Sequence, residues 1–171
     1  MGTPDLPQKR LPTRVDTPGA PGRPCSIAAA LKIVGERWAL LAVREIGFGN
    51  HRFDQIAINT GASRDILTAR LRSLEAAGVL YRSLYNERPP RYQYHLTEAG
   101  RDLFPVLAAL RDWGDRWLVE EKPTVVEHTC GHELRVVSSC EHCGGRLDSR
   151  GGPAVARFQA PGWSKSGPVE D

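Results

Sequence analysis

Apolar side chains recur at three- and four-residue intervals from residue 26 onward, a spacing that predicts amphipathic helices. Four helices are expected, over residues 26–34, 37–46, 53–59 and 64–77. Ser63 is a good N-cap for the fourth helix, and Gly78 is placed to end it. The inward face of that helix should consist of three leucines, Leu67, Leu71 and Leu74.

The apolar pattern changes period after residue 78. Residues 79–85 and 92–96 are rich in β-branched and aromatic side chains, which favours a β-hairpin whose basic, proline-containing loop spans residues 86–91. Thr97 then caps a further helix, which Pro105 should kink or restart. The apolar face of this helix carries Leu103, Val106, Leu107, Leu110, Trp113 and Trp117. The predicted fold class is mainly α with a small β-hairpin (α+β), and the last helix is a candidate for dimerisation.

Both ends of the chain are poor in large apolar side chains. Residues 1–24 contain six prolines, and residues 149–171 are rich in glycine, proline and serine. Such segments bury too little surface to offset their ordering entropy, so both are expected to be disordered. The folded parts should be a main domain over residues 25–120 and a Cys/His-rich tail over residues 121–148.

Composition excludes several classes of protein. A hydrophobic fraction of 40% and a charged fraction of 25% are typical of soluble globular proteins. No apolar run approaches the roughly 20 residues of a membrane span, and the N-terminus lacks the pattern of a secretory signal. The cytoplasm is therefore the expected compartment, where the four cysteines should stay reduced unless they have redox or metal chemistry.

Two helices joined by a short turn and followed by a β-hairpin are the element order of a winged helix-turn-helix. The second helix of such a motif fits the major groove of double-stranded DNA, and its N-terminal end reads base edges. This makes Ser63, Arg64, Asp65 and Thr68 candidates for base or phosphate contacts, and Arg72 a candidate for a phosphate contact. In the hairpin, Arg88 and Arg91, preceded by Arg82, would reach the neighbouring minor groove or its phosphates.

Positive charge is concentrated in the same region. Residues 52–92 contain seven arginines and four acidic side chains, a surplus equal to the formal net charge of +3 of the whole chain. Arg52 opens this region and is a further candidate DNA contact. Arginines on amphipathic helices are also ordinary solvated residues, so a winged helix that binds another protein rather than DNA remains an alternative.

The residues of this region resemble a known family. The segment Cys25–Trp38 closely resembles the opening of the HxlR family of bacterial winged-helix regulators, which are related to the MarR group. The similarity continues in order to about residue 118, through Arg52-Phe53, Ser63-Arg64, Leu67–Leu71, Gly78–Leu80, Pro89–Tyr94, Leu96–Gly100 and Trp113. It implies a transcriptional regulator that forms a homodimer through its first and last helices. The two recognition helices would enter successive major grooves of a palindromic operator, roughly 34 Å apart.

Two cysteine-containing sites are candidates for sensing or metal binding. Cys25 lies at the start of the first helix, where unpaired N–H groups stabilise a thiolate. In the resembling family a cysteine here is a recurrent redox or electrophile sensor, and the alternative is a small buried hydrophobe. In the tail, a zinc-ribbon-like site of four ligands is expected from Cys130, His132, Cys140 and Cys143, with His128 or His142 as substitutes. A redox-active Cys140–Cys143 pair is the alternative to zinc.

No phosphate-binding loop, nucleophile elbow or pair of carboxylates beside a histidine is present, so no enzymatic activity is expected. A thiol/disulfide oxidoreductase is the enzyme alternative. The expected mechanism is repression by competition for a promoter, relieved when a signal changes the spacing of the two recognition helices. The signal would act at Cys25 or as a small molecule in an apolar pocket lined by Trp38, Phe48, Phe104 and Trp113.

Overall fold

The computed structural model describes residues 23–147, 157 and 159–169. Of the two terminal segments expected to be disordered, residues 1–22, 149–156, 158 and 170–171 lie outside the described residues. Residues 159–169 are described and contain a small hairpin closed by the bridge Trp163↔Pro168. The described chain divides into two compact units, one formed by Pro24–Phe104 and the other by Arg23 with the described residues from Pro105 onward. None of the described helices is long and apolar enough to cross a membrane.

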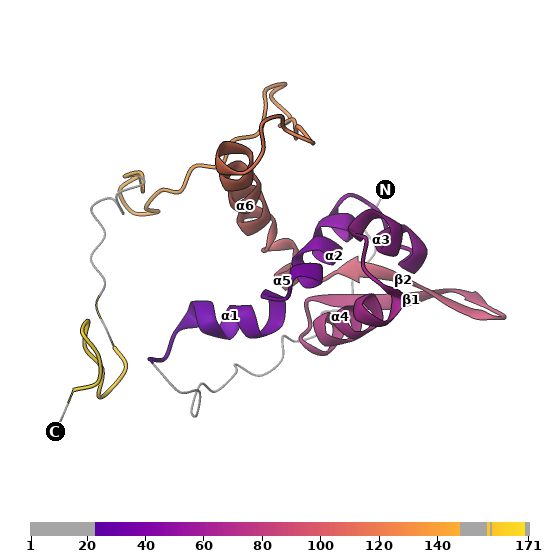
Figure 1. Ribbon diagram of the computed structural model, residues 1–171, viewed down its shortest axis with the longest axis horizontal. Helices are drawn as coiled ribbons and strands as arrows, with labels where there is room; N and C mark the ends of the chain where they lie inside the picture. Colours follow the sequence, from indigo (N-terminus) through magenta and orange to yellow (C-terminus); the bar gives the residue numbers. More distant parts are fainter. Residues whose placement is uncertain (1–22, 148–156, 158, 170–171) are drawn as a thin grey trace. The chain divides into compact units, whose positions relative to one another are not determined.

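The first unit contains the four helices that the apolar spacing predicts, with ends within about two residues of the expected positions (Figure 1). They are α1 (Ser26–Val34), α2 (Arg37–Gly47), α3 (Phe53–Thr60) and α4 (Arg64–Ala76). Ser63 caps α4 as expected, because its hydroxyl accepts a hydrogen bond from the N–H of Ile66 at 3.4 Å. Gly61, at φ +70°, ends α3, so only three residues separate α3 from α4.

The predicted hairpin is present and longer than expected. Strand β1 (Leu80–Glu87) pairs antiparallel with β2 (Pro90–Leu96), in a register that runs from Leu80↔Leu96 to Glu87↔Pro90 with an irregularity near Leu84. The predicted loop over residues 86–91 is therefore too long, since only Arg88 and Pro89 lie between the strands. Asn and Pro favour turns locally, but cross-strand pairing extends almost to the tip and overrides that preference. The hairpin projects beyond α3 and α4 as a wing (Figure 1).

The core of the first unit lies between its helices and the base of the hairpin. The three leucines predicted to face inward from α4 are at most 1% exposed. The buried apolar side chains of the described chain are Val34, Ala39, Ala42, Val43, Ile46, Ile56, Ala62, Leu67, Leu71, Leu74, Val79, Leu80 and Leu96. The short helix α5 (Glu98–Arg101) begins with Thr97 as its N-cap, as predicted, because the Thr97 hydroxyl accepts from the Gly100 N–H at 3.2 Å. These features confirm the α+β fold class.

The second unit begins within α6 (Phe104–Trp117). Pro105 is the second residue of this helix, so the proline restarts a helix rather than kinking one, and its missing N–H breaks no helical hydrogen bond there. Between α6 and residue 147 lie two small hairpins, closed by the bridges Glu127↔Glu133 and Ser139↔Arg146. No described residue of this unit is buried.

Candidate nucleic-acid interface

Helix α4 presents a polar face opposite its buried leucines. Ser63, Arg64, Asp65 and Arg72 are exposed and Thr68 is half-buried, so all five candidates on this helix lie at the surface or its margin. Ile66, in the first turn of the same helix, is 43% exposed. An apolar group among these polar ones suits contact with a thymine methyl group. Sequence reasoning missed Ile66 because its spacing resembles that of a core residue.

Arg64 is held against the first turn of α3. Its Nη1 lies 2.8 Å from Oδ1 of Asp54, and its guanidinium lies 4.8 Å from the centre of the Phe53 ring. Both partners of the ion pair are exposed, so the pair contributes little to stability. Its consequence is orientation, because the guanidinium is presented beside the N-terminus of α4, where it can exchange Asp54 for a DNA phosphate or base.

Two further arginines lie over tyrosine rings of the hairpin. The Arg52 guanidinium is 5.1 Å from the Tyr85 ring centre, and that of Arg82 is 4.8 Å from the Tyr92 ring centre. Arg82 also lies 3.3 Å from a carboxylate oxygen of Glu75 on α4. Cation–π contacts of this kind restrict the side chains while leaving the N–H groups available. The pairing of β1 with β2 brings Arg82 near the Tyr92 ring, whereas Arg52 reaches Tyr85 from the N-cap of α3, so sequence order alone gives no sign of the second contact.

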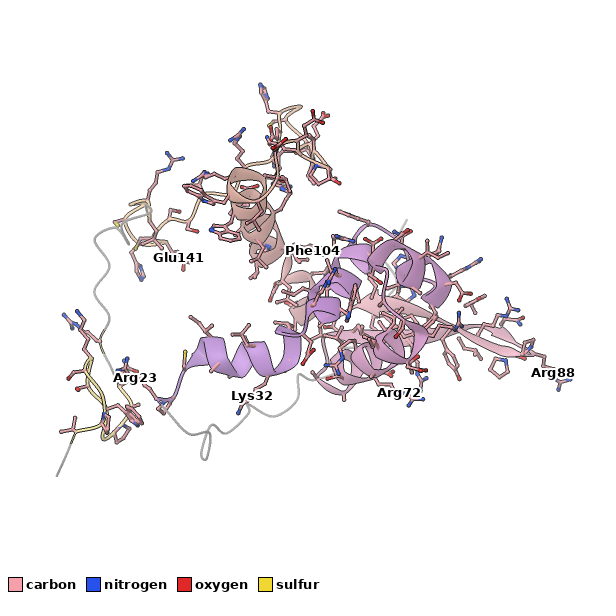
Figure 2. The ribbon with its side chains drawn as sticks, viewed as in Figure 1. Arg23, Lys32, Arg72, Arg88, Phe104 and Glu141 are labelled. Carbon is pink, nitrogen blue, oxygen red and sulfur yellow. The ribbon has the colours of Figure 1, made fainter. Side chains whose placement is uncertain are left out.

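The remaining basic candidates point outward. Figure 2 shows Arg72 on the outer side of α4 and Arg88 at the far end of the hairpin. Within the described part of the chain, Arg72, Arg88 and Arg91 form no ion pair with an acidic side chain. These three positive charges are therefore not neutralised by close carboxylates, as phosphate contacts require.

A buried carboxylate sets the geometry of the motif. Glu45 of α2 is 4% exposed and accepts hydrogen bonds from Arg44 Nε at 2.9 Å and from the side-chain amides of Asn50 and Asn59 at 2.8 Å each. One acid thus ties α2 to the following turn and to α3. Sequence reasoning missed Glu45, since charged residues in helices are usually solvated and only the tertiary contacts identify this one as buried.

His51, just before α3, contacts the base of the hairpin, where His95 lies. His51 Nδ1 lies 2.8 Å from the Tyr94 carbonyl oxygen, and His95 Nε2 lies 3.0 Å from the Ser83 hydroxyl. The two imidazole rings have centroids 4.6 Å apart. Burial, and then the neighbouring His51, lower the pKa of His95. The folded wing therefore favours the neutral form of the His95 imidazole over the protonated form.

Cys25 occupies the predicted position at the N-cap of α1, where its thiol is free and exposed and makes no capping hydrogen bond. Its redox sensitivity stays a prediction. The aromatic side chains expected to line an effector pocket have separate surroundings in the structure. Trp38 lies under the Arg37 guanidinium at 4.3 Å, Phe104 packs against Gly47, and the side chains of Phe48 and Trp113 are exposed. The pocket likewise stays a prediction.

The four expected zinc ligands lie on the two small hairpins of the second unit. The backbone N–H groups of Cys143 and then of His142, followed by the Cys143 thiol, lower the pKa of Cys140. Cys140 and Cys143 belong to one turn, in which the Gly144 N–H donates to the Cys140 carbonyl at 2.8 Å. Among the described residues no group of three or more His, Cys, Asp and Glu side chains is close enough to hold a metal ion. Cys130 and His132 of the first hairpin therefore lie apart from Cys140 and Cys143 of the second. Sequence spacing could not predict this, because it does not determine how two hairpins are oriented.

These elements define a class of protein. Helices α2 to α4, with a three-residue turn before a capped and exposed α4 and a two-stranded wing after it, form a winged helix-turn-helix. The family model of the HxlR-like helix-turn-helix matches residues 33–122. The chain belongs to this family.

Several relatives show the same relationship. The chain is 43% identical over 128 residues to the HTH-type transcriptional regulator Rv3095 of Mycobacterium tuberculosis, covering 73% of this chain and 81% of the relative. It is 39% identical over 101 residues to the HTH-type transcriptional regulator sll1512 of Synechocystis, covering 58% and 75% of the two chains. The crystal structure of PA1607, described as a transcription factor, matches with 31% identity and a TM-score of 0.65 over 78% of this chain and 94% of its own. The chain is a DNA-binding transcriptional regulator and not an enzyme.

Proposed function

We propose that this regulator is a homodimeric repressor that acts in the cytoplasm on a palindromic operator. The observation that supports this most directly is the apolar surface of α6. Trp113 is 55% and Trp117 67% exposed, and no side chain of the helix is buried. Exposed aromatic surface of this extent is typical of a protein interface, and a second copy of the chain is the occupant that a regulator of a palindromic site requires.

Helix α1 offers a second surface of the same kind. Ile27 is 70% and Leu31 55% exposed, four residues apart on one side of the helix. A twofold axis that pairs both helices with their counterparts would cover these side chains. It would also present two α4 helices to successive major grooves about 34 Å apart.

In this dimer each α4 reads one half-site. Arg64 and its neighbours at the N-terminus of α4 contact base edges, while Arg72 contacts a phosphate. The wing residues Arg88 and Arg91 reach the adjacent minor groove, and Arg52 adds a backbone contact. An operator that overlaps a promoter would then exclude RNA polymerase.

A signal that changes the dimer would release the operator. The exposed Cys25 thiol lies at the start of α1, one of the two helices assigned to the interface. Its oxidation, or a small molecule bound between the aromatic side chains, would shift the spacing of the recognition helices by a few ångströms and lower the affinity for DNA.

The test is selection of bound fragments from genomic DNA with the reduced full-length protein, with molar mass measured by light scattering on the same sample. We expect a palindromic consensus, a dimeric mass, and affinity that falls steeply with salt. Arg72→Ala should weaken binding, while Arg157→Ala, which removes the same charge from an exposed position outside α1 and α6, should not. A monomeric protein, or a consensus without twofold symmetry, would contradict the proposal.

A further inference from the structure

The second hairpin of the tail has the backbone of a metal-binding turn. The Cys140 N–H donates to the Gly145 carbonyl and the Gly144 N–H donates to the Cys140 carbonyl, each at 2.8 Å. Gly144, directly after Cys143, has φ +68°. The Cys143 sulfur packs over Gly145, 3.2 Å from the position that a Cβ there would take. Two sulfur ligands are thus held together by one turn.

The first hairpin repeats this plan. The His128 N–H donates to the His132 carbonyl at 2.9 Å and the Gly131 N–H donates to the His128 carbonyl at 2.8 Å. Gly131, directly after Cys130, has φ +81°. In both hairpins a cysteine followed by a left-handed glycine stands at the turn.

The hydrogen bonds of the two histidines distinguish them as ligands. His132 Nδ1 lies 3.2 Å from the Cys130 carbonyl oxygen, which accepts only, so Nδ1 carries the proton and Nε2 keeps its lone pair. A metal-bound histidine characteristically donates its other ring N–H to a carbonyl in this way. His128 Nδ1 instead accepts the Cys130 N–H at 3.3 Å, which places the proton of the neutral ring on Nε2. His132 is therefore the better ligand.

The first hairpin is attached to α6, whereas the second has no described hydrogen bond to it. Arg111 Nη2 donates to the Leu134 carbonyl at 2.6 Å, and the Val136 N–H donates to the Asp112 carboxylate at 2.8 Å. Only residues 135–138 join the first hairpin to the second. Neither hairpin buries a side chain, and segments this small usually need a metal or disulfides to fold.

We propose that the two hairpins close on one structural Zn²⁺ ion bound by Cys130, His132, Cys140 and Cys143. The Cys140–Cys143 turn is the preformed half of the site, and the short link allows it to meet the half attached to α6. Three thiols release their protons to solvent on binding, and His132 binds through Nε2. Four protein ligands leave no open position, so the metal's role is to fold the tail. This inference does not depend on the proposed dimer or operator.

The experiment measures metal in the full-length protein purified under reducing conditions. We expect one zinc per chain by mass spectrometry of the metal, and visible d–d bands of tetrahedral thiolate ligation when Co²⁺ replaces it. Cys140→Ser and Cys143→Ser should remove zinc, and Cys130→Ser and His132→Gln should weaken its binding at least tenfold. His128→Gln, His142→Gln and Cys25→Ser are the matched controls and should retain it.

The helical circular dichroism of each variant guards against misfolding, because the helices of the first unit have their own core. Several results would overturn the site. The first is a protein that contains no zinc as isolated and binds none when titrated with Zn²⁺. The second is a stoichiometry of one zinc per two chains. The third is a His132→Gln variant that retains zinc as the control variants do. Ready formation of a Cys140–Cys143 disulfide in zinc-free protein that fails to rebind zinc after reduction would instead identify a redox pair.

Discussion

The two units of this chain are stabilised in different ways. All thirteen buried apolar side chains of the described chain belong to the first unit, whereas the described part of the second unit buries none. The first unit can therefore fold through its own hydrophobic core. The second displays an apolar helix and small hairpins closed by backbone hydrogen bonds, without a buried core among its described residues. The difference separates the part that positions helix α4 from the part that presents exposed apolar side chains.

The largest effect should come from opening the core of the first unit. Leu71→Ala removes a side chain that is 1% exposed and should lower the free energy of unfolding by about 2–5 kcal/mol. Leu110→Ala on α6 removes the same atoms from a half-exposed site and should cost under about 1 kcal/mol in the isolated chain. Urea unfolding followed by circular dichroism at low protein concentration compares them. Equal losses of unfolding free energy in the two variants would contradict the conclusion that only the first unit has a hydrophobic core.

The second effect concerns assembly. Trp113→Ala should raise the dimer dissociation constant at least about tenfold, because exposed tryptophans that become buried at interfaces carry much of the binding energy. Sedimentation at several concentrations measures the constant. Ile58→Ala, which removes an exposed apolar side chain from α3 of the first unit, is the control and should leave it unchanged.

The third effect tests the buried carboxylate of the first unit against an acid of the second. Glu45→Ala leaves the amides of Asn50 and Asn59 without their acceptor and should cost about 1–3 kcal/mol. Asp112→Ala removes contacts to Arg111 and the Val136 N–H at a half-exposed position and should cost less than about 1 kcal/mol of global stability. Thermal melts show which variant loses more stability. A larger loss for Asp112→Ala than for Glu45→Ala would contradict the structural role assigned to Glu45.

The fourth effect concerns DNA. Arg64→Ala should weaken specific binding by about 1–3 kcal/mol and relax base preference at one position of each half-site. Arg88→Ala should weaken binding to all sequences and reduce the salt dependence by about one phosphate contact. Fluorescence anisotropy over a salt series distinguishes the two. If Arg64→Ala changed only the salt slope, its assignment to a base edge would be wrong.

The smallest effect is a pH dependence of the wing. The pKa of His95 lies below its ordinary value, so the unfolded chain binds more protons than the folded one between the two values. The stability from this group is present above about pH 6.5 and declines as the pH falls toward the folded-state pKa. Urea midpoints at about pH 7.5 and about pH 5.5 should differ more in the natural protein than in His95→Gln. No such difference would contradict the role assigned to His95.

Sequence alone was sufficient wherever the controlling interaction is local. The stripe of Leu67, Leu71 and Leu74 follows from helical periodicity, because residues three and four apart share a face. The caps at Ser63 and Thr97 follow from side chains that bond N–H groups three residues ahead. Pro105 was expected to kink or restart a helix because it lacks an N–H, and the structure shows a restart. These features, with the family resemblance, determined the fold class and the exposed arginines of the DNA-reading helix.

Tertiary structure decided whatever depends on residues far apart in the chain. Cross-strand register extended the hairpin to Arg88 and Pro89 and brought the Tyr92 ring near Arg82, and the packing of α3 against the hairpin placed Arg52 over Tyr85. The packing of α2 against α3 and the turn between them buries Glu45, and the residues around Glu45 in the sequence do not predict this burial. The tail is limited in the same way. Sequence spacing predicted four zinc ligands, but the relative orientation of the two hairpins depends on long-range contacts that local patterns do not predict.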